Sequence, residues 1–149
     1  LQTVLINGFM IFIGIAVYFL LIEYLGLADQ FYLRILNLFI VGFGINLTLK
    51  QNAHNGIRGY FANLISGIAT SMVGAILSVG SLLFYIEYKG GDAYLQTLSK
   101  GFLFGGGDLN ISYYCIGLFF ESIASSIIIS FVLMQFWKNK AETINKVNA

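Results

Sequence analysis

The chain has 149 residues, of which 58% are hydrophobic and only 10% are charged, and its formal net charge is +1 at pH 7. Its mean hydropathy is +0.81. These values exclude an ordinary soluble domain, and the small net charge argues against any nucleic-acid partner. A small integral membrane protein is the class that remains.

Four long apolar runs, separated by short polar stretches, define the organisation of the chain. In order they cover residues 4–27, 31–49, 61–86 and 111–137. Each can cross a hydrocarbon core of ~30 Å, which takes about 20 residues of helix. We therefore predict an all-α membrane protein, a four-transmembrane-helix bundle. Residues 1–149 form its single transmembrane domain, and residues 138–149 are a short basic cytoplasmic tail.

The connections between the runs differ in length. The first, about residues 28–30, is so short that the first two spans should form an antiparallel hairpin. The third covers roughly residues 87–110, and within it Asp92 can cap a short helix that reads AYLQTLSK and stops at Gly101. We expect this helix to lie in the outer interface or to fold back over the mouth of the bundle.

The distribution of basic residues predicts the orientation. Five lie in the second connection or after Trp137, against three on the opposite side, and basic residues that flank spans prefer the cytoplasm. We therefore expect both termini inside (N-in/C-in) in a bacterial inner (cytoplasmic) membrane. The two basic groups are Lys50, Arg58, Lys138, Lys140 and Lys146, and on the other side Arg34, Lys89 and Lys100.

Seven of the nine tyrosines fall at or near the predicted outer side. They form either an aromatic belt at the level of the lipid headgroups or an outward surface for a partner protein. These residues are Tyr24, Tyr32, Tyr85, Tyr88, Tyr94, Tyr113 and Tyr114.

Small residues recur every four positions along the third span, and such stripes let helix backbones approach closely in lipid. Serines repeat at the same spacing in the fourth span, at positions 122, 126 and 130. The stripe therefore packs spans three and four together, or it faces another subunit. Its members are Ser66, Gly67, Thr70, Ser71, Gly74, Ala75 and Ser78.

Glu121 is the most unusual residue, because it lies about ten residues inside the fourth run. A charged carboxylate that faces lipid there costs ~2.5–3.5 kcal/mol, so Glu121 should face the bundle, be protonated or be paired. Tyr114 and Ser125 share its helical stripe, and Arg34 is the plausible basic partner, for which Glu23 competes. Three interpretations remain open: a proton or cation site, an inward structural carboxyl, or contact with a partner subunit.

Residues of other functional classes are sparse. The only histidine, His54, lies in the second connection, so no span offers axial histidines to a haem. Cys115 is the only cysteine, which excludes an intrachain disulfide, and it reads as a small buried side chain. Neither metal-ligand spacing nor a nucleophile with its base is apparent. We therefore expect no cofactor, no metal and no enzyme.

Several local patterns from the second span onward resemble a known family. They are Asn46–Lys50, the basic loop Gly56-Ile57-Arg58-Gly59-Tyr60, the glycine- and serine-rich third span, and a final span ending SSIIISFVLMQFWK. Over about two thirds of its length, the chain resembles the DUF4199 family of small four-span bacterial membrane proteins of unknown function. The resemblance implies a four-span fold and an inner-membrane location, and no catalytic residues.

Two functions are compatible with these features. The first is a non-enzymatic accessory or scaffold subunit of a larger membrane complex, whose partners are the lipid bilayer and other membrane subunits or a second copy of the chain. The alternative is a small dimeric transporter, coupled to protons or cations through Glu121.

Overall fold

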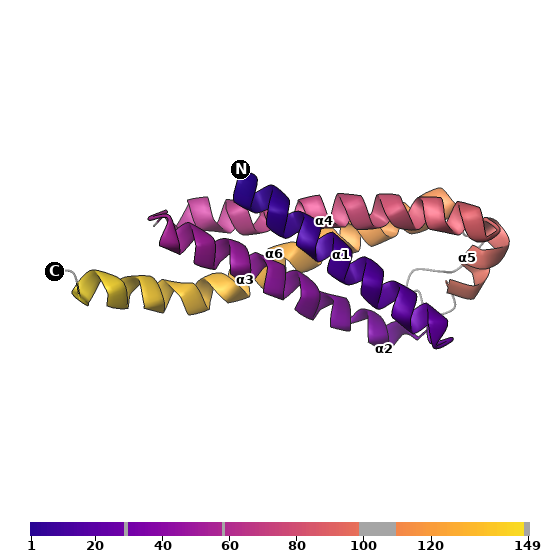
Figure 1. Cartoon of the computed structure of the whole chain (residues 1–149), viewed down its shortest axis with the longest axis horizontal. Coiled ribbons are helices and arrows are strands. Elements are labelled where there is room, and N and C mark those ends of the chain that lie inside the picture. Colours follow the sequence, from indigo (N-terminus) through magenta and orange to yellow (C-terminus); the bar gives the residue numbers. More distant parts are fainter. Residues whose placement is uncertain (29, 58, 99–109, 148–149) are drawn as a thin grey trace.

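The chain folds as an elongated bundle of helices, seen here in a computed structural model (Figure 1). The structure describes residues 1–28, 30–57, 59–98 and 110–147. All the elements in these residues are helices, which confirms the all-α prediction for them. They are α1 (Gln2–Tyr24), α2 (Phe31–Arg34), α3 (Leu36–His54), α4 (Tyr60–Lys89), α5 (Asp92–Leu98) and α6 (Ile111–Val147).

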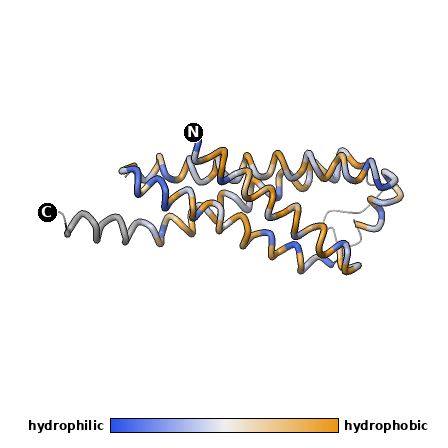
Figure 2. Tube along the Cα trace, in the orientation of Figure 1, coloured by the Kyte–Doolittle hydropathy of each residue, from blue (hydrophilic) through white to orange (hydrophobic). Residues whose placement is uncertain are grey.

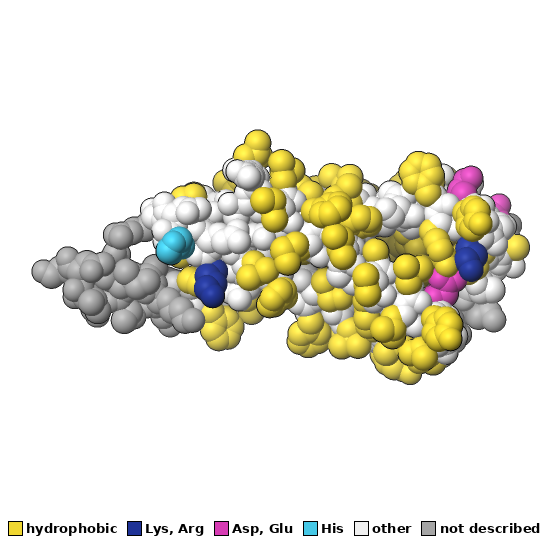
Figure 3. All heavy atoms as spheres, viewed as in Figure 1, with side chains coloured by type: hydrophobic (Ala, Val, Ile, Leu, Met, Phe, Trp, Pro, Cys, Tyr) yellow, Lys and Arg dark blue, Asp and Glu magenta, His cyan; other side chains and the backbone are white. Residues whose placement is uncertain are grey.

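Four stretches of helix are long and apolar enough to cross a membrane: Gln2–Tyr24, Tyr32–His54, Tyr60–Lys89 and Ile111–Trp137. They correspond to the four predicted runs. Hydrophobic residues line these helices along their lengths (Figure 2). On the visible face, the acidic side chains lie near the end where α5 is, and basic side chains lie toward both ends (Figure 3). The chain therefore has the helices of a multi-pass membrane protein.

The spans alternate in direction along the long axis of the bundle. Figure 1 shows α1 and α4 running toward the end where α5 lies, and α3 and α6 running back from it. Both chain termini point toward the end opposite α5. This is the arrangement expected of an even number of spans joined end to end.

Two glycines set the ends of α1 and α3, and both ends differ from the predicted ones. Gly26 and Gly56 have φ angles of 71° and 78°. After each, the chain closes a Schellman motif, in which Leu27 N–H donates to the Ile22 carbonyl and Ile57 N–H donates to the Asn52 carbonyl. As a result α1 ends at Tyr24 instead of residue 27, and α3 extends to His54. Residues 50–54, predicted to be a connection, are helical.

Two further boundaries differ from the sequence-based ones. Helix α6 continues past the fourth span to Val147, so most of the predicted tail is helical, as its lysine, glutamate and alanine content favours. Helix α5 begins at Asp92, as predicted, and is described as far as Leu98. The rest of the predicted AYLQTLSK helix and its glycine stop lie outside the described residues.

The second span is interrupted at Ile35, between α2 and α3, although the chain contains no proline. Around the interruption the backbone makes shorter-range bonds, from Ile35 N–H to the Tyr32 carbonyl and from Leu38 N–H to the Ile35 carbonyl. The Tyr18 hydroxyl of α1 donates to the Leu33 carbonyl at 2.8 Å. A side chain that inserts into the helical ladder is a known cause of such breaks.

The centre of the bundle is held together by close packing around Ile11 of α1, whose side chain is only 1% exposed. A Cβ placed on Gly44 of α3 would lie 2.2 Å from Ile11 Cγ1, and one on Gly74 of α4 would lie 2.7 Å from Ile11 Cγ2. Ile11 therefore fits between two helices at positions where neither has a side chain. This is how small residues replace the hydrophobic drive that lipid does not supply.

A buried polar network lies beside this contact. Asn7 of α1 donates to Thr48 and to Gln51 of α3, both at 3.0 Å. Thr48 in turn shares a hydrogen bond of 2.9 Å with Thr70 of α4. The network links three spans and satisfies polar groups that lipid could not.

Candidate functional site

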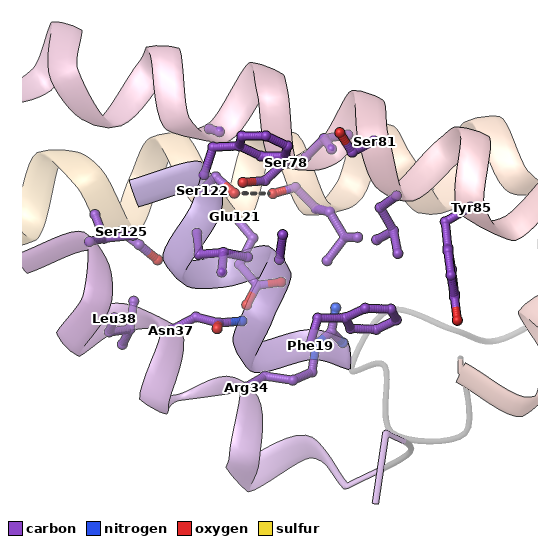
Figure 4. A pocket seen from close by; sticks show the side chains of 18 of the residues that line it. Phe19, Arg34, Asn37, Leu38, Ser78, Ser81, Tyr85, Glu121, Ser122 and Ser125 are labelled. Carbon is purple, nitrogen blue, oxygen red and sulfur yellow. Dashed lines mark hydrogen bonds between the residues drawn. The ribbon is translucent and has the colours of Figure 1, made fainter. Parts of the chain in front are cut away.

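A cavity of about 360 Å³ lies between the four spans, in the half of the bundle nearest α5. All four spanning helices and α5 contribute to its wall (Figure 4). Its lining is mostly aliphatic and aromatic. The polar exceptions include a carboxylate, a guanidinium, an amide and several serines: Glu121, Arg34, Asn37, Ser78, Ser122 and Ser125.

Helix α5 packs across the end of the bundle, next to the cavity. Its Leu95 and Leu98 are buried in one cluster with Ile86 of α4 and Tyr114 of α6. Leu98 also lines the cavity.

Glu23 of α1 links α4 and α5 at this end of the bundle. Tyr94 of α5 donates a hydrogen bond of 2.8 Å to Glu23 Oε1, and Tyr85 of α4 donates to Oε2. Lys89 Nζ lies 3.8 Å from the same carboxylate. Burial and the nearby Glu23 charge raise the pKa of the Tyr94 phenol above its ordinary value of 10, so the phenol keeps its proton and remains a donor.

Arg34 reaches into the cavity from the end of α2, beside the interruption of the second span. Its Nη2 donates to the Tyr114 hydroxyl at 3.3 Å, and its guanidinium carbon lies 5.8 Å from the centre of the Tyr114 ring. Tyr114 is buried. The structure thus joins two residues that are 80 positions apart in the chain.

Glu121 points from α6 into the cavity, toward the side where α3 carries Asn37 and Leu38 (Figure 4). It nevertheless remains exposed in the isolated chain. The next residue, Ser122, returns its hydroxyl to the Leu118 carbonyl of its own helix at 2.8 Å. Glu121 therefore lines the cavity, but the bundle alone does not enclose it.

The Asn37 Oδ1 atom of α3 and the Ser78 Oγ atom of α4 line the cavity and are buried without a hydrogen-bond partner. A buried polar atom without a partner costs about 1–3 kcal/mol. Such atoms are candidates for contact with a bound molecule or with water.

The four residues predicted for an intramembrane polar site, Glu121, Arg34, Tyr114 and Ser125, all line this one cavity. Asn37 also lines the cavity, and it follows Arg34 by one helical turn. The contact of Glu23 with two tyrosines was not predicted at all. Its only sequence signal was the excess of tyrosines on one side of the chain.

The small-residue stripe of α4 faces three neighbouring helices within the chain. A Cβ at Gly67 would lie 3.1 Å from Ile45 Cγ2 of α3 and 3.3 Å from Ser130 Oγ of α6, whereas one at Gly74 would meet Ile11 of α1. At the stripe's ends, Ser66 accepts a bond from Thr70 through its carbonyl, and Ser78 lines the cavity. The remaining buried members are Ser71 and Ala75.

The tyrosines of the outer side divide into two groups. Tyr85, Tyr94 and Tyr114 make the inward hydrogen bonds described above. The other four are exposed and remain available for a headgroup belt or a partner surface: Tyr24, Tyr32, Tyr88 and Tyr113.

The described residues contain no group of three or more histidine, cysteine, aspartate or glutamate side chains placed to hold a metal ion. Cys115 is buried, as predicted. No protein family, curated protein or solved structure matches this chain. The resemblance to the DUF4199 family therefore stays a prediction, and the cavity itself is the main source of functional information.

Proposed function

We propose that this chain is a small, non-enzymatic membrane transporter that binds its solute in the cavity between its four spans. One observation carries the proposal: Arg34 and Glu121, an intramembrane cation and an intramembrane anion, line the same cavity. Charged groups within spans are costly, and they mark solute paths and proton relays more often than packing contacts.

The cavity has the size and lining of a ligand site. Its volume of about 360 Å³ lies within the range of ~300–1,000 Å³ that is common for small-molecule pockets. Its wall is mostly apolar with a few convergent polar groups, and the unpartnered atoms of Asn37 and Ser78 are among them. A carboxylate within a span is the kind of group that couples transport to protons or cations, and Glu121 supplies one here.

The proposal is tested by flux in proteoliposomes. An imposed pH gradient should drive proton movement that a fluorescent pH dye reports, and Glu121→Gln should abolish it. Glu87→Gln is the matched control, because Glu87 is exposed on α4 and does not line the cavity. Equal proton flux in the Glu121 variant and the unaltered protein would remove this carboxylate from the mechanism.

A second candidate is the accessory or scaffold subunit, and the exposure of Glu121 favours it. An apolar groove lies on the outside of the bundle between α3 and α6, the helix that carries Glu121. Its lining includes Phe39, Phe43 and Phe136. A partner subunit seated there could cover the carboxylate. Mild-detergent purification from native membranes distinguishes the two, because a stoichiometric complex favours the subunit and a lone chain or homodimer favours the transporter.

We place the protein in a bacterial inner membrane, with both termini in the cytoplasm. The support is the excess of basic residues in the second connection and after Trp137. Single cysteines introduced at Asn55 and at Gln96, in a Cys115→Ala background, test this orientation. An impermeant maleimide added to spheroplasts should label position 96 and spare position 55, and the reverse result would invert the orientation.

A further inference from the structure

We infer that the solute of the cavity is a small zwitterion with an apolar body, bound with its ammonium group at Glu121 and Asn37 and its anionic group at Arg34 and Tyr114. An apolar α-amino acid is the simplest member of this class. The inference rests on the proposed function, and it adds the chemical class of the solute.

Two side chains of opposite charge line the wall of the cavity. Glu121 and Arg34 point into one cavity from α6 and from α2 (Figure 4). Both lie within membrane-spanning stretches, where water screens charges poorly. A solute with only a positive charge is attracted by Glu121 and repelled by Arg34, and one with only a negative charge meets the opposite problem. A solute that carries both charges can place each of them next to a wall group of opposite sign, and it leaves the net charge of the cavity unchanged.

The hydrogen-bonding groups of the wall are separated by type, with acceptors at Glu121 and Asn37 and donors at Arg34 and Tyr114. The Asn37 Oδ1 atom is a buried acceptor without a partner, and it lies on the side of the cavity toward which Glu121 points (Figure 4). An ammonium group offers three donors and no acceptor, which suits this pair. The hydroxyl of Tyr114 and the guanidinium of Arg34 are in contact with each other and can both donate to an anionic group.

The rest of the cavity wall is apolar. It is aliphatic and aromatic, with Phe12, Ile15 and Phe19 from α1, Val79 and Leu82 from α4, and Leu118 from α6. The volume of about 360 Å³ is many times what a single water molecule needs. A small polar zwitterion such as free glycine would leave most of this apolar surface in contact with water. An apolar body displaces that water, which favours binding.

Equilibrium binding of three related probes to the purified protein in lipid nanodiscs tests the inference. Phenylalanine is the zwitterion, phenethylamine lacks its carboxylate, and hydrocinnamate lacks its ammonium group. We expect phenylalanine to bind at least ~10-fold more tightly than either singly charged probe, and more tightly than free glycine.

Opposite changes in selectivity distinguish direct contact from structural damage. Glu121→Gln should make hydrocinnamate the preferred probe, and Arg34→Gln should make phenethylamine the preferred one. Glu87→Gln and Lys50→Gln, both exposed and outside the cavity, should leave the order unchanged. If Arg34→Gln does not fold, Tyr114→Phe removes one hydroxyl and should weaken phenylalanine without affecting phenethylamine.

The outcomes separate this inference from the proposed function. Equal affinity for phenylalanine and phenethylamine would refute the inference that the solute is a zwitterion. So would variants that lower the affinity for all probes alike. If no probe binds but proton flux still depends on Glu121, the transporter proposal is supported and the inference that its solute is a zwitterion is refuted. If no probe binds and no flux is seen, both are refuted.

Discussion

Gly44→Ala should destabilise the bundle, because Ile11 of α1 occupies the place where the new methyl group would stand. The added Cβ would lie 2.2 Å from Ile11 Cγ1 and 2.6 Å from Ile11 Cδ1, whereas carbon atoms in contact are ~3.5–4.0 Å apart. Ile11 is 1% exposed, so its side chain is surrounded by other atoms and cannot simply turn out to the surface. Overpacking of this kind typically costs ~1–3 kcal/mol, and we expect the free energy of unfolding to fall by that amount.

A second substitution shows whether this contact is the cause. Ile11→Ala removes both atoms that Gly44→Ala would meet, and alone it should cost at most ~2–5 kcal/mol through the space that it leaves. In the double variant the new methyl group at Gly44 occupies part of that space. The double variant should therefore be more stable than the sum of the two single effects predicts, by ~1–3 kcal/mol.

Reversible unfolding in mixed dodecyl sulfate and dodecyl maltoside micelles, followed by circular dichroism, measures these differences. Gly80→Ala is the matched control, because a Cβ at Gly80 of α4 would have no atom within 4 Å. It should be neutral or stabilising by up to ~1 kcal/mol. Unchanged stability in Gly44→Ala, or strict additivity in the double variant, would refute the packing of Ile11 against α3.

Three further outcomes can be measured on the same preparation. Asn7→Ala removes two hydrogen bonds, which average ~0.6 kcal/mol each between membrane helices, so it should lower the unfolding free energy by about 1 kcal/mol; no change would exclude the network as a source of stability. The pKa of Tyr94 is raised by folding, so its contribution to stability should be complete below pH 10 and decline as the pH rises above it. Tyr94→Phe should reduce this decline, and stability that rises above pH 10 would contradict the contact with Glu23. Cys115 is 5% exposed, so a maleimide should react slowly with the folded protein and rapidly in dodecyl sulfate; equal rates would show that this part of α6 is open.

The existence and order of the four spans could be predicted from the sequence, because a membrane imposes length and hydrophobicity on each helix separately. The ends of the helices depend on local backbone conformation. Gly26 and Gly56 could have indicated where α1 and α3 stop, since each adopts the left-handed conformation that favours glycine. The first apolar run extends past Gly26 to residue 27, whereas α1 ends at Tyr24. The second run stops at residue 49, whereas α3 continues to His54, so hydrophobicity alone misplaced both helix ends.

The candidate site was predictable only where a residue contradicts its surroundings. Glu121 attracted attention because a carboxylate is rare within a span, and its helical stripe led to Tyr114 and Ser125. Glu23 lies at the end of a span, where an acid is ordinary, and its contact with Tyr94 joins positions 71 residues apart. Long-range contacts of this kind have no local pattern, so they become visible only when the helices are assembled.

The interruption of the second span was not predictable for the same reason, since its cause belongs to another helix. This origin also affects what the interruption can do. A proline ring deletes a backbone N–H permanently, whereas the Tyr18 hydroxyl only occupies the carbonyl of Leu33. If the hydroxyl moves away, that carbonyl can again accept from the backbone of its own helix. The interruption of the span that carries Arg34 is therefore accompanied by a hydrogen bond whose donor belongs to another helix, α1.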